Sequence, residues 1–129
     1  MSQENVEIAR KAIEAWNAGD MDGLRDLYDP DAVYATPSDW IGGPYLGRDA
    51  IMEQFAEIRD IWTGGSFDRV DVVDAGDRVV VQVAFHGDTR GLPLSTDVAW
   101  VYTMREGLIT RLEFFRSRGE ALEAAGLSE

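Results

Sequence analysis

The segment AWNAGDMDGLRDLYDPDAVY, residues 15–34, contains the end of one helix, a short second helix and the start of a strand. Gly19 predicts the end of the first helix, because glycine readily adopts the left-handed conformation that closes helices. Asp20 can then cap a second helix, whose apolar residues are Met21, Leu24, Leu27 and Tyr28. Asp29-Pro30-Asp31 predicts a turn into a brief strand, which we prefer to a pair of catalytic carboxylates.

One further helix is predicted on either side of this segment. Before Gly19, the residues at helical spacing on one face are Val6, Ala9, Ile13 and Trp16. A third helix begins at about Arg48, and its apolar stripe consists of Ile51, Phe55, Ile58 and Trp62. Residues 36–47, TPSDWIGGPYLG, contain three glycines and two prolines, and therefore predict a loop between the first strand and the third helix.

The second half of the chain changes from helical to strand periodicity. Four strand-like segments cover residues 67–75, 77–87, 94–105 and 108–117. Tight turns are expected at residues 75–77 and 105–107, with a longer connection at 87–93 and a short final helix that ends at Gly126. Helices followed by an antiparallel meander indicate an α+β fold, in one domain over residues 1–129.

Composition narrows the classes of protein and site. Hydrophobic residues at 45% and charged residues at 28% are globular values, and no apolar run suggests a membrane span or a signal peptide. With no cysteine, we expect a cytoplasmic protein without disulfides. With one histidine, no cysteine and no glycine-rich phosphate loop, we expect no metal and no cofactor. A carboxylate-only site for calcium or magnesium stays open, although no EF-hand spacing is present. A net charge of −12 argues against nucleic acid or membrane partners, and eleven arginines against one lysine hint at a GC-rich bacterial genome.

Alternation along the strands separates two faces of the expected sheet. The faces with Val79, Trp100 and Phe114 are the more apolar, so we expect them to contact the helices. The opposite faces still carry Val80, Val101, Ile109 and Phe115. Such an apolar outer surface on a small protein indicates a partner, most simply a second copy of the chain.

Three stretches resemble the SnoaL-like family of the NTF2-like superfamily. They are residues 15–34, then GRDAIMEQF at 47–55, and REGLITRLEFFRSRGEALEAAGL at 105–127. The resemblance covers nearly the whole chain and implies a cone-shaped α+β barrel, in which a curved antiparallel sheet wraps around three N-terminal-half helices and a pocket lies between them. It also implies dimerisation through the outer sheet face. The fold hosts ketosteroid isomerases, polyketide cyclases and many non-enzymes, so it does not assign a function by itself.

The catalytic residues that the resemblance implies are absent at the matching positions. Ketosteroid isomerases hold a general-base aspartate before a proline of the first strand, where this sequence has Thr36. Their oxyanion-hole tyrosine falls at Ala12, and their partner aspartate falls near Trp100. In the polyketide cyclases, a histidine also falls at Trp100 and an aspartate falls at Phe114. Steroid isomerisation by the family mechanism is therefore not expected.

We therefore predict a homodimer that binds a small apolar organic ligand in an aromatic-lined pocket. The expected pocket residues are Trp16, Tyr34, Thr36, Trp40, Tyr45, Phe55, Trp62, Val81, Val83, Trp100, Tyr102, Leu112, Phe114 and Arg116. An ordinary aromatic core is the alternative for any one of these rings.

Two other interpretations remain open at the level of sequence. The first is a cyclase, isomerase or hydrolase with an unusual catalytic set, for which the candidates are Asp39, Tyr45, His86 and Arg116. Each has a plainer explanation: Asp39 can cap a turn, His86 can lie at the surface or an interface, and Arg116 can pair with one of the many acids. The second is a dimerisation module with a closed core and no cavity.

Overall fold

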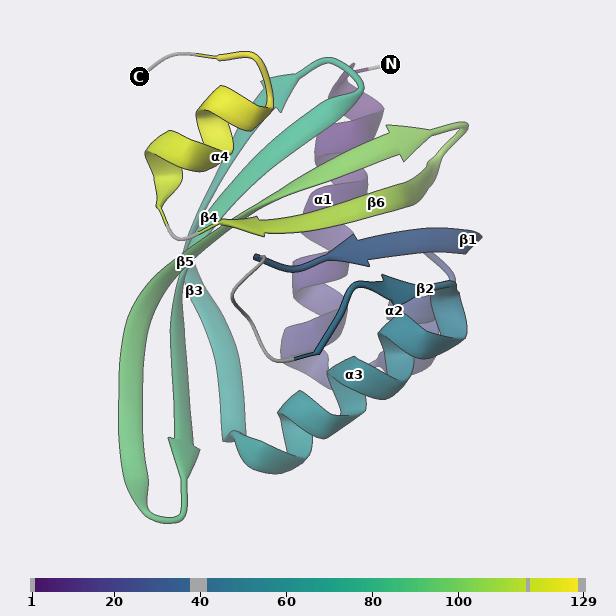
Figure 1. Cartoon of the computed structure of the whole chain (residues 1–129). Helices are drawn as coiled ribbons and strands as arrows, with labels where there is room; N and C mark the ends of the chain where they lie inside the picture. Colours follow the sequence, from purple (N-terminus) through teal and green to yellow (C-terminus); the bar gives the residue numbers. More distant parts are fainter. Residues whose placement is uncertain (1, 38–41, 116, 128–129) are drawn as a thin grey trace.

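A computed structural model of the chain describes residues 2–37, 42–115 and 117–127 (Figure 1). In chain order the elements are α1 (Ser2–Ala18), α2 (Met21–Arg25), β1 (Tyr28–Ala35), β2 (Tyr45–Leu46), α3 (Arg48–Ile61), β3 (Thr63–Ala75), β4 (Arg78–Thr89), β5 (Leu92–Arg105), β6 (Leu108–Phe115) and α4 (Arg118–Ala124). Helices first and strands later is the expected α+β order. None of the helices in these ranges is long and apolar enough to cross a membrane.

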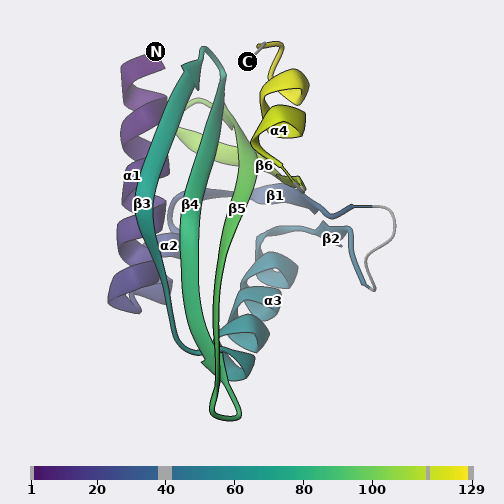
Figure 2. The ribbon, with the colours of Figure 1, turned by 90° about the vertical axis from the view of Figure 1, so that its left-hand side faces the viewer.

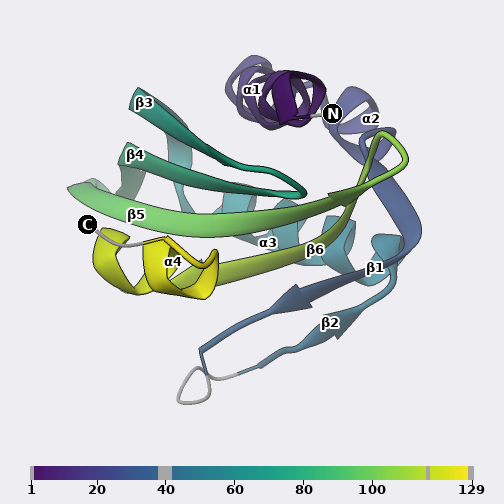
Figure 3. The same cartoon turned by 90° about the horizontal axis from the view of Figure 1, so that it is seen from above.

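The strands form one six-stranded sheet in the order β2-β1-β6-β5-β4-β3. Figure 3 shows this sheet curving around the three helices of the N-terminal half, with α4 on its outer side. The sheet is mixed and not purely antiparallel as expected, because β1 pairs in parallel with β6. The chain reaches β6 only after α3 and the meander, so β1 can align beside the last strand in the same direction.

The segment around residues 20–35 differs in detail from its prediction. Asp20 caps α2 as expected, since its Oδ1 accepts a hydrogen bond from the Gly23 N–H at 2.9 Å. Tyr28, however, is the first residue of β1 and not the last of the helix. Asp29-Pro30-Asp31 lies inside β1, where the pairing with β6 is irregular between Tyr28 and Val33. The Asp31 N–H donates to Asp29 Oδ1 at 2.8 Å, so a local turn is built into the strand.

The connection between β4 and β5 was expected to be a seven-residue loop and is instead a tight hairpin. The strands continue to Thr89 and Leu92, and only Arg90 and Gly91 separate them. Both turn residues have positive φ, 53° and 82°, as a two-residue turn with strand-matched twist requires. This hairpin extends past the end of α3, as Figure 2 shows. The two other turns, at Gly76 and at Gly107, lie where the sequence predicted them.

The main core fills the concave side of the sheet. Alternate residues of β4 and β5, including Val79, Val81, Val83, Trp100 and Tyr102, are at most 4% exposed and pack against α1 and α3 residues. This is the face that the strand alternation assigned to the helices.

The outer face differs from expectation at four apolar residues. Val80, Ala99 and Val101 are covered by Ala121 and Leu122 of α4, so this chain buries them itself. Ile109 is fully buried in the main core on the other side. The register between β5 and β6 shifts at this point: Thr103 pairs with Arg111, whereas the next residue, Met104, pairs with Ile109. This shift turns the Ile109 side chain from the expected outer face of the sheet to the inner face. The apolar outer patch expected to contact a second copy is therefore smaller than the alternation predicted.

Candidate functional site

A cavity of about 300 Å³ lies between the N-terminal helices and the concave face of the sheet. Its lining comes from α1, α2, α3 and five strands, so the fold as a whole shapes it. The lining residues are Ala12, Ile13, Trp16, Leu24, Tyr28, Tyr34, Gln54, Phe55, Ile58, Trp62, Phe67, Phe85, Val98, Trp100, Tyr102, Leu112 and Phe114. Of these residues none is charged, and Gln54 alone carries an amide.

Eight of the residues predicted for a pocket line this cavity. They are Trp16, Tyr34, Phe55, Trp62, Trp100, Tyr102, Leu112 and Phe114. Val81 and Val83 lie in the core without lining it. Thr36 and Tyr45 also stay outside the lining: the Thr36 hydroxyl faces the Gly42 carbonyl at 3.4 Å, and Tyr45 packs on the ring of Tyr34. Asp39, Trp40 and Arg116 lie outside the described residues.

Some of the lining residues that were not predicted could have been found from patterns in the sequence. Ile58 shares the α3 stripe with Phe55, and Phe85 shares the inner face of β4 with Val83. Tyr28 is not among the predicted pocket residues because the sequence pattern assigns it to the second helix, whereas it lies on β1. Gln54 has no signal in the sequence, because a glutamine beside an apolar stripe is ordinarily a solvent-facing residue.

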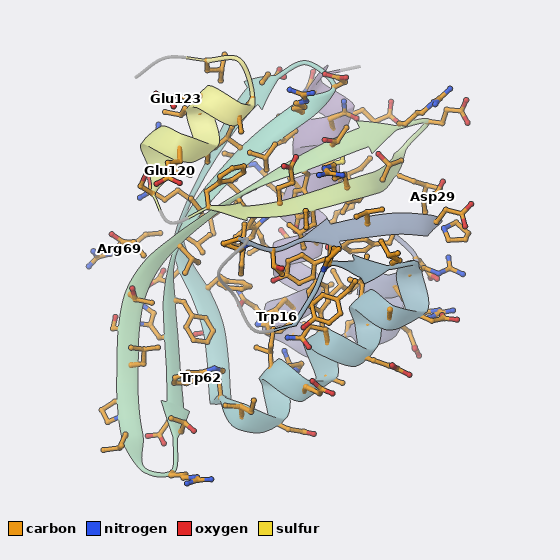
Figure 4. All side chains as sticks on the ribbon, viewed as in Figure 1. Trp16, Asp29, Trp62, Arg69, Glu120 and Glu123 are labelled. Carbon is orange, nitrogen blue, oxygen red and sulfur yellow. The ribbon has the colours of Figure 1, made fainter. Side chains whose placement is uncertain are left out.

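Exposure divides the lining into a buried part and a part near the surface. Tyr28, Tyr34 and Leu24 are 1–2% exposed, so they belong to the closed end. Gln54, Ile58, Trp62, Val98 and Phe114 are half-buried, so they mark where the cavity approaches solvent. Figure 4 labels Trp16, in the interior, and Trp62, where β3 leaves the end of α3.

Aromatic rings make a nearly continuous wall. Phe67 lies 5.6 Å from Trp16 and 5.2 Å from Trp100, measured between ring centroids. Phe114 continues the wall, 5.5 Å from Trp100 and 5.8 Å from Tyr34. The rings are tilted or edge-to-face, which are the favourable arrangements for aromatic pairs. Such a wall offers both faces and edges to a planar guest.

Two polar contacts hold this wall in place. The amide of Asn17, on α1, both donates to the Phe67 carbonyl at 2.9 Å and accepts from the Phe67 N–H at 2.8 Å. Since β3 is an edge strand, these bonds satisfy backbone groups that no other strand can pair. Arg59 of α3 donates to the Trp16 carbonyl at 2.8 Å and lies 5.0 Å from the centre of a Trp16 ring.

Three buried tyrosines bring hydroxyl groups to the cavity. Burial raises the pKa of Tyr28 well above its ordinary value of 10.0, and interactions with Tyr102 and Tyr34 raise it further. Burial is also the main cause of the raised pKa of Tyr34. Burial raises the pKa of Tyr102 to about 12, while Trp100 and Tyr28 act in the opposite direction. All three phenols are therefore neutral at physiological pH and can donate a hydrogen bond, but they cannot act as bases.

Two indole N–H groups in the same lining have no acceptor. Trp16 Nε1 and Trp100 Nε1 are both buried, and neither has a hydrogen-bond partner in the structure. Trp100 lies near enough to Tyr102 to lower the pKa of that phenol, yet its N–H is not at hydrogen-bonding geometry. An unpaired buried donor costs about 1–3 kcal/mol, so two in one cavity wall call for an explanation.

His86 lies away from this cavity, on the outer face of the sheet. Its Nδ1 is 2.8 Å from the Ser95 hydroxyl, and its Nε2 is 3.7 Å from Asp68 Oδ2. The arrangement is superficially similar to a catalytic triad, but the His86 and Asp68 side chains are 44% and 67% exposed, and neither residue lines the cavity. No group of three or more acidic or histidine side chains among the described residues could hold a metal ion.

Comparison with solved structures finds the same fold in proteins of low sequence identity. TerC, co-crystallised with polyporic acid, is 26% identical, with a TM-score of 0.77 over 95% of this chain and 98% of its own. A protein with a ketosteroid isomerase-like fold from Catenulispora acidiphila, in complex with trimethylamine, is 24% identical, with a TM-score of 0.75 over 94% and 93%. A candidate polyketide cyclase from Xanthomonas campestris pv. campestris is 20% identical, with a TM-score of 0.80 over 96% and 98%.

No curated protein matches the sequence. A family model does: that of the SnoaL-like domain matches residues 9–112. The match includes most of the cavity lining, from Ala12 on α1 to Leu112 on β6. The neighbouring structures agree with it in architecture, since they share the NTF2-like curved sheet and helices. This chain belongs to the SnoaL-like domain family.

Proposed function

We propose that the protein binds a small, mainly apolar organic molecule in the cavity between the helices and the sheet. The observation that carries the proposal is the cavity itself, about 300 Å³ in volume and lined by aromatic and aliphatic side chains. That volume is near the lower end of the range for small-molecule sites, about 300–1,000 Å³. A ligand of two or three fused rings suits it. TerC, which was crystallised with polyporic acid, supports an organic guest in this fold.

The proposal does not include the isomerase mechanism of the family. Ala12 and Trp100 line the cavity, and neither supplies the phenol or carboxylate that steroid isomerisation needs. The described lining contains no carboxylate and no histidine that could act as a base. We therefore propose binding as the function of this cavity and assign no reaction to it. Of the candidates for an unusual catalytic set, Tyr45 does not line the cavity and His86 lies on the other face of the sheet, which leaves Asp39 and Arg116.

A cavity-filling substitution tests the proposal. Ala12 is 2% exposed and lines the cavity, so Ala12→Leu places three further carbon atoms there. The expected result is that fluorene, a flat three-ring hydrocarbon, quenches the tryptophan fluorescence of the wild-type protein and binds Ala12→Leu at least tenfold more weakly. Ala56→Leu is the matched control, because Ala56 is exposed to solvent and does not line the cavity. Equal binding to all three proteins would rule out this cavity as the site.

We also propose that the protein is a homodimer through the outer face of the sheet. Part of that face is covered by α4, but the half around His86 and Ser95 is not among the residues that α4 covers. The proposal rests on that remaining surface and on the dimers implied by the family resemblance. Native mass spectrometry of the freshly purified protein reports the oligomer, and would also reveal a co-purified ligand. A monomer at micromolar concentration would refute the dimer.

A further inference from the structure

The first part of β5 forms an open edge of the sheet. Residues 99–105 of β5 pair with β6, but the six residues from Leu92 to Asp97 extend past the end of β6, within the β4–β5 hairpin (Figure 1). All six are exposed, and no described residue pairs with them on the side that faces away from β4. The strand is therefore central in one half of the sheet and an edge in the other half.

The backbone of this edge offers hydrogen-bonding groups at alternate residues. In an antiparallel pair, every second residue turns its N–H and C=O away from the partner strand. The two-residue turn at Arg90-Gly91 decides which residues these are, because the residues that flank such a turn face each other in hydrogen-bonding positions. The groups that point away from β4 then belong to Pro93, Ser95 and Asp97. They comprise three carbonyl oxygens but two N–H groups, because proline has no N–H.

The side chains of the edge differ between the two faces of the sheet. On the inner face Leu92 is 68% and Leu94 38% exposed, and half-buried Val98 continues the same row. On the outer face Asp97 is exposed, and Asp88 lies on the neighbouring strand. Neither aspartate forms an ion pair with any described residue. The open edge is thus apolar on one face and acidic on the other.

From these features we propose that the β5 edge binds an extended peptide segment of another protein, in which basic and apolar residues alternate. The segment adds a strand to the sheet, and its basic residues exchange backbone hydrogen bonds with Ser95 and Asp97. Residues that face each other across a ladder lie on the same face, so a lysine opposite Asp97 meets its free carboxylate. A lysine nearer the hairpin turn extends toward Asp88, and the intervening apolar residues cover Leu94 and Val98. The inference goes beyond the proposed ligand and does not depend on it.

A second copy of the chain fits this edge less well than a basic segment does. An antiparallel pair of two such edges, centred on Ser95, would place each Pro93 opposite an Asp97. The Asp97 carbonyl would then face a residue without an N–H. Residues 92–98 contain no lysine or arginine, so the Asp97 carboxylate would also stay unpaired. Proline and charged residues on an edge strand are the features that suppress pairing between identical edges.

The test measures the binding of a fluorescein-labelled heptapeptide, Val-Lys-Val-Lys-Val-Lys-Val, to the intact protein by fluorescence anisotropy. Two matched peptides carry three N-methyl groups each, one on the lysines and the other on the last three valines. Methylation of the lysines removes the N–H groups that face β5, whereas methylation of the valines alters groups that point away from it. Asp97→Lys reverses the charge at the edge. Glu14→Lys makes the same change at an exposed position of α1 and is its control.

The expected result is that the valine-methylated peptide binds like the unmethylated one, while methylation of the lysines weakens binding about tenfold or more, because several hydrogen bonds are lost. Asp97→Lys weakens binding of the unmethylated peptide about fivefold, and Glu14→Lys leaves it unchanged. A peptide with glutamate in place of each lysine should prefer Asp97→Lys to the wild-type protein.

Three outcomes would overturn the inference. Equal effects of the two methylations would show that charge alone attracts the peptide, without strand pairing. Absence of binding to the wild-type protein would refute the edge as a peptide site and leave the proposed cavity function intact. Sedimentation velocity of the protein alone tests the other occupant: self-association that Leu94→Lys abolishes would assign the edge to a second copy.

Discussion

At the scale of single residues, Asn17 connects the first helix to the cavity wall. Its amide makes two hydrogen bonds to the backbone of Phe67, whose ring contacts both Trp16 and Trp100. One side chain on α1 thereby fixes the position of an aromatic residue on the edge strand. No pattern in the sequence marks this role, because the two residues are 50 positions apart.

Replacing Asn17 by alanine should loosen this edge of the sheet. We expect Asn17→Ala to lower the free energy of unfolding by about 1 kcal/mol, because both bonds are solvent-exposed. Urea denaturation measures the loss, with Glu14→Ala, at an exposed position of the same helix, as the control. Fluorene binding should weaken in Asn17→Ala as well. Unchanged stability and unchanged binding would show that the two bonds do not hold Phe67.

The buried phenols predict how stability depends on alkaline pH. In the unfolded chain tyrosines ionise near pH 10, whereas burial raises the pKa of Tyr102 to about 12 and also raises the pKa of Tyr28 well above its ordinary value. Between these values the unfolded state binds fewer protons than the folded state, so the free energy of unfolding must fall as pH rises above about 10. Below pH 10 these phenols should not affect the pH dependence.

Urea denaturation between pH 8 and pH 12 checks this expectation. Tyr102→Phe should show a shallower decline above pH 10 than the wild-type protein, because one of the raised phenols is gone. Identical slopes for the two proteins would contradict burial of the Tyr102 hydroxyl.

At the scale of secondary-structure elements, the sequence predicted the helices and the inner strand faces well. Ile51 and Phe55 on α3, and Val79 and Val81 on β4, lie in the core because period and apolar spacing agree there. Ile109 was misplaced because the register shift that turns it inward depends on pairing with β5, which local alternation does not contain.

The parallel pairing of β1 with β6, and the set of core residues that border the cavity, could not be predicted from the sequence for a related reason. Parallel pairing joins residues about 80 positions apart, such as Tyr28 and Ile109, so no short segment encodes it. Apolar spacing identified the inward-facing rings. It did not separate Val81 and Val83, which are packed within the core, from Trp100 and Phe114, which border a space. That distinction depends on how side chains from several elements fill one volume.

The C-terminal helix acts as a cover for the outer face. Ala121 and Leu122 bury Val80 and Val101, and Arg78 donates to the Ala124 carbonyl at 3.0 Å. Leu122→Ala should therefore destabilise the fold by about 2 kcal/mol, at the low end for a buried leucine because the cluster is small. Thermal and urea denaturation measure the effect, and Glu123→Ala on the exposed side is the control. Equal stability of the two variants would show that α4 does not need this contact.

At the scale of the whole molecule, the cavity links ligand binding to folding. Its lining is drawn from both halves of the chain, from Ala12 to Phe114, so a ligand should bind the folded state alone. Fluorene at a hundred times its dissociation constant should raise the free energy of unfolding by about 2.7 kcal/mol. The same concentration should leave Ala12→Leu nearly unchanged. A ligand that binds tightly without stabilising the fold would have to occupy a surface site.

The place where an aromatic ligand binds can be read from the indole N–H signals of a ¹H–¹⁵N NMR spectrum, recorded with and without the ligand. Trp16 and Trp100 line the cavity, so the ring currents of bound fluorene should shift their N–H signals strongly. The backbone amide of Phe67, held by Asn17, should shift with them. The signals of His86 and Ser95, on the outer face, should change little. Shifts confined to that outer face, with the Trp16 and Trp100 signals unmoved, would contradict binding in the cavity.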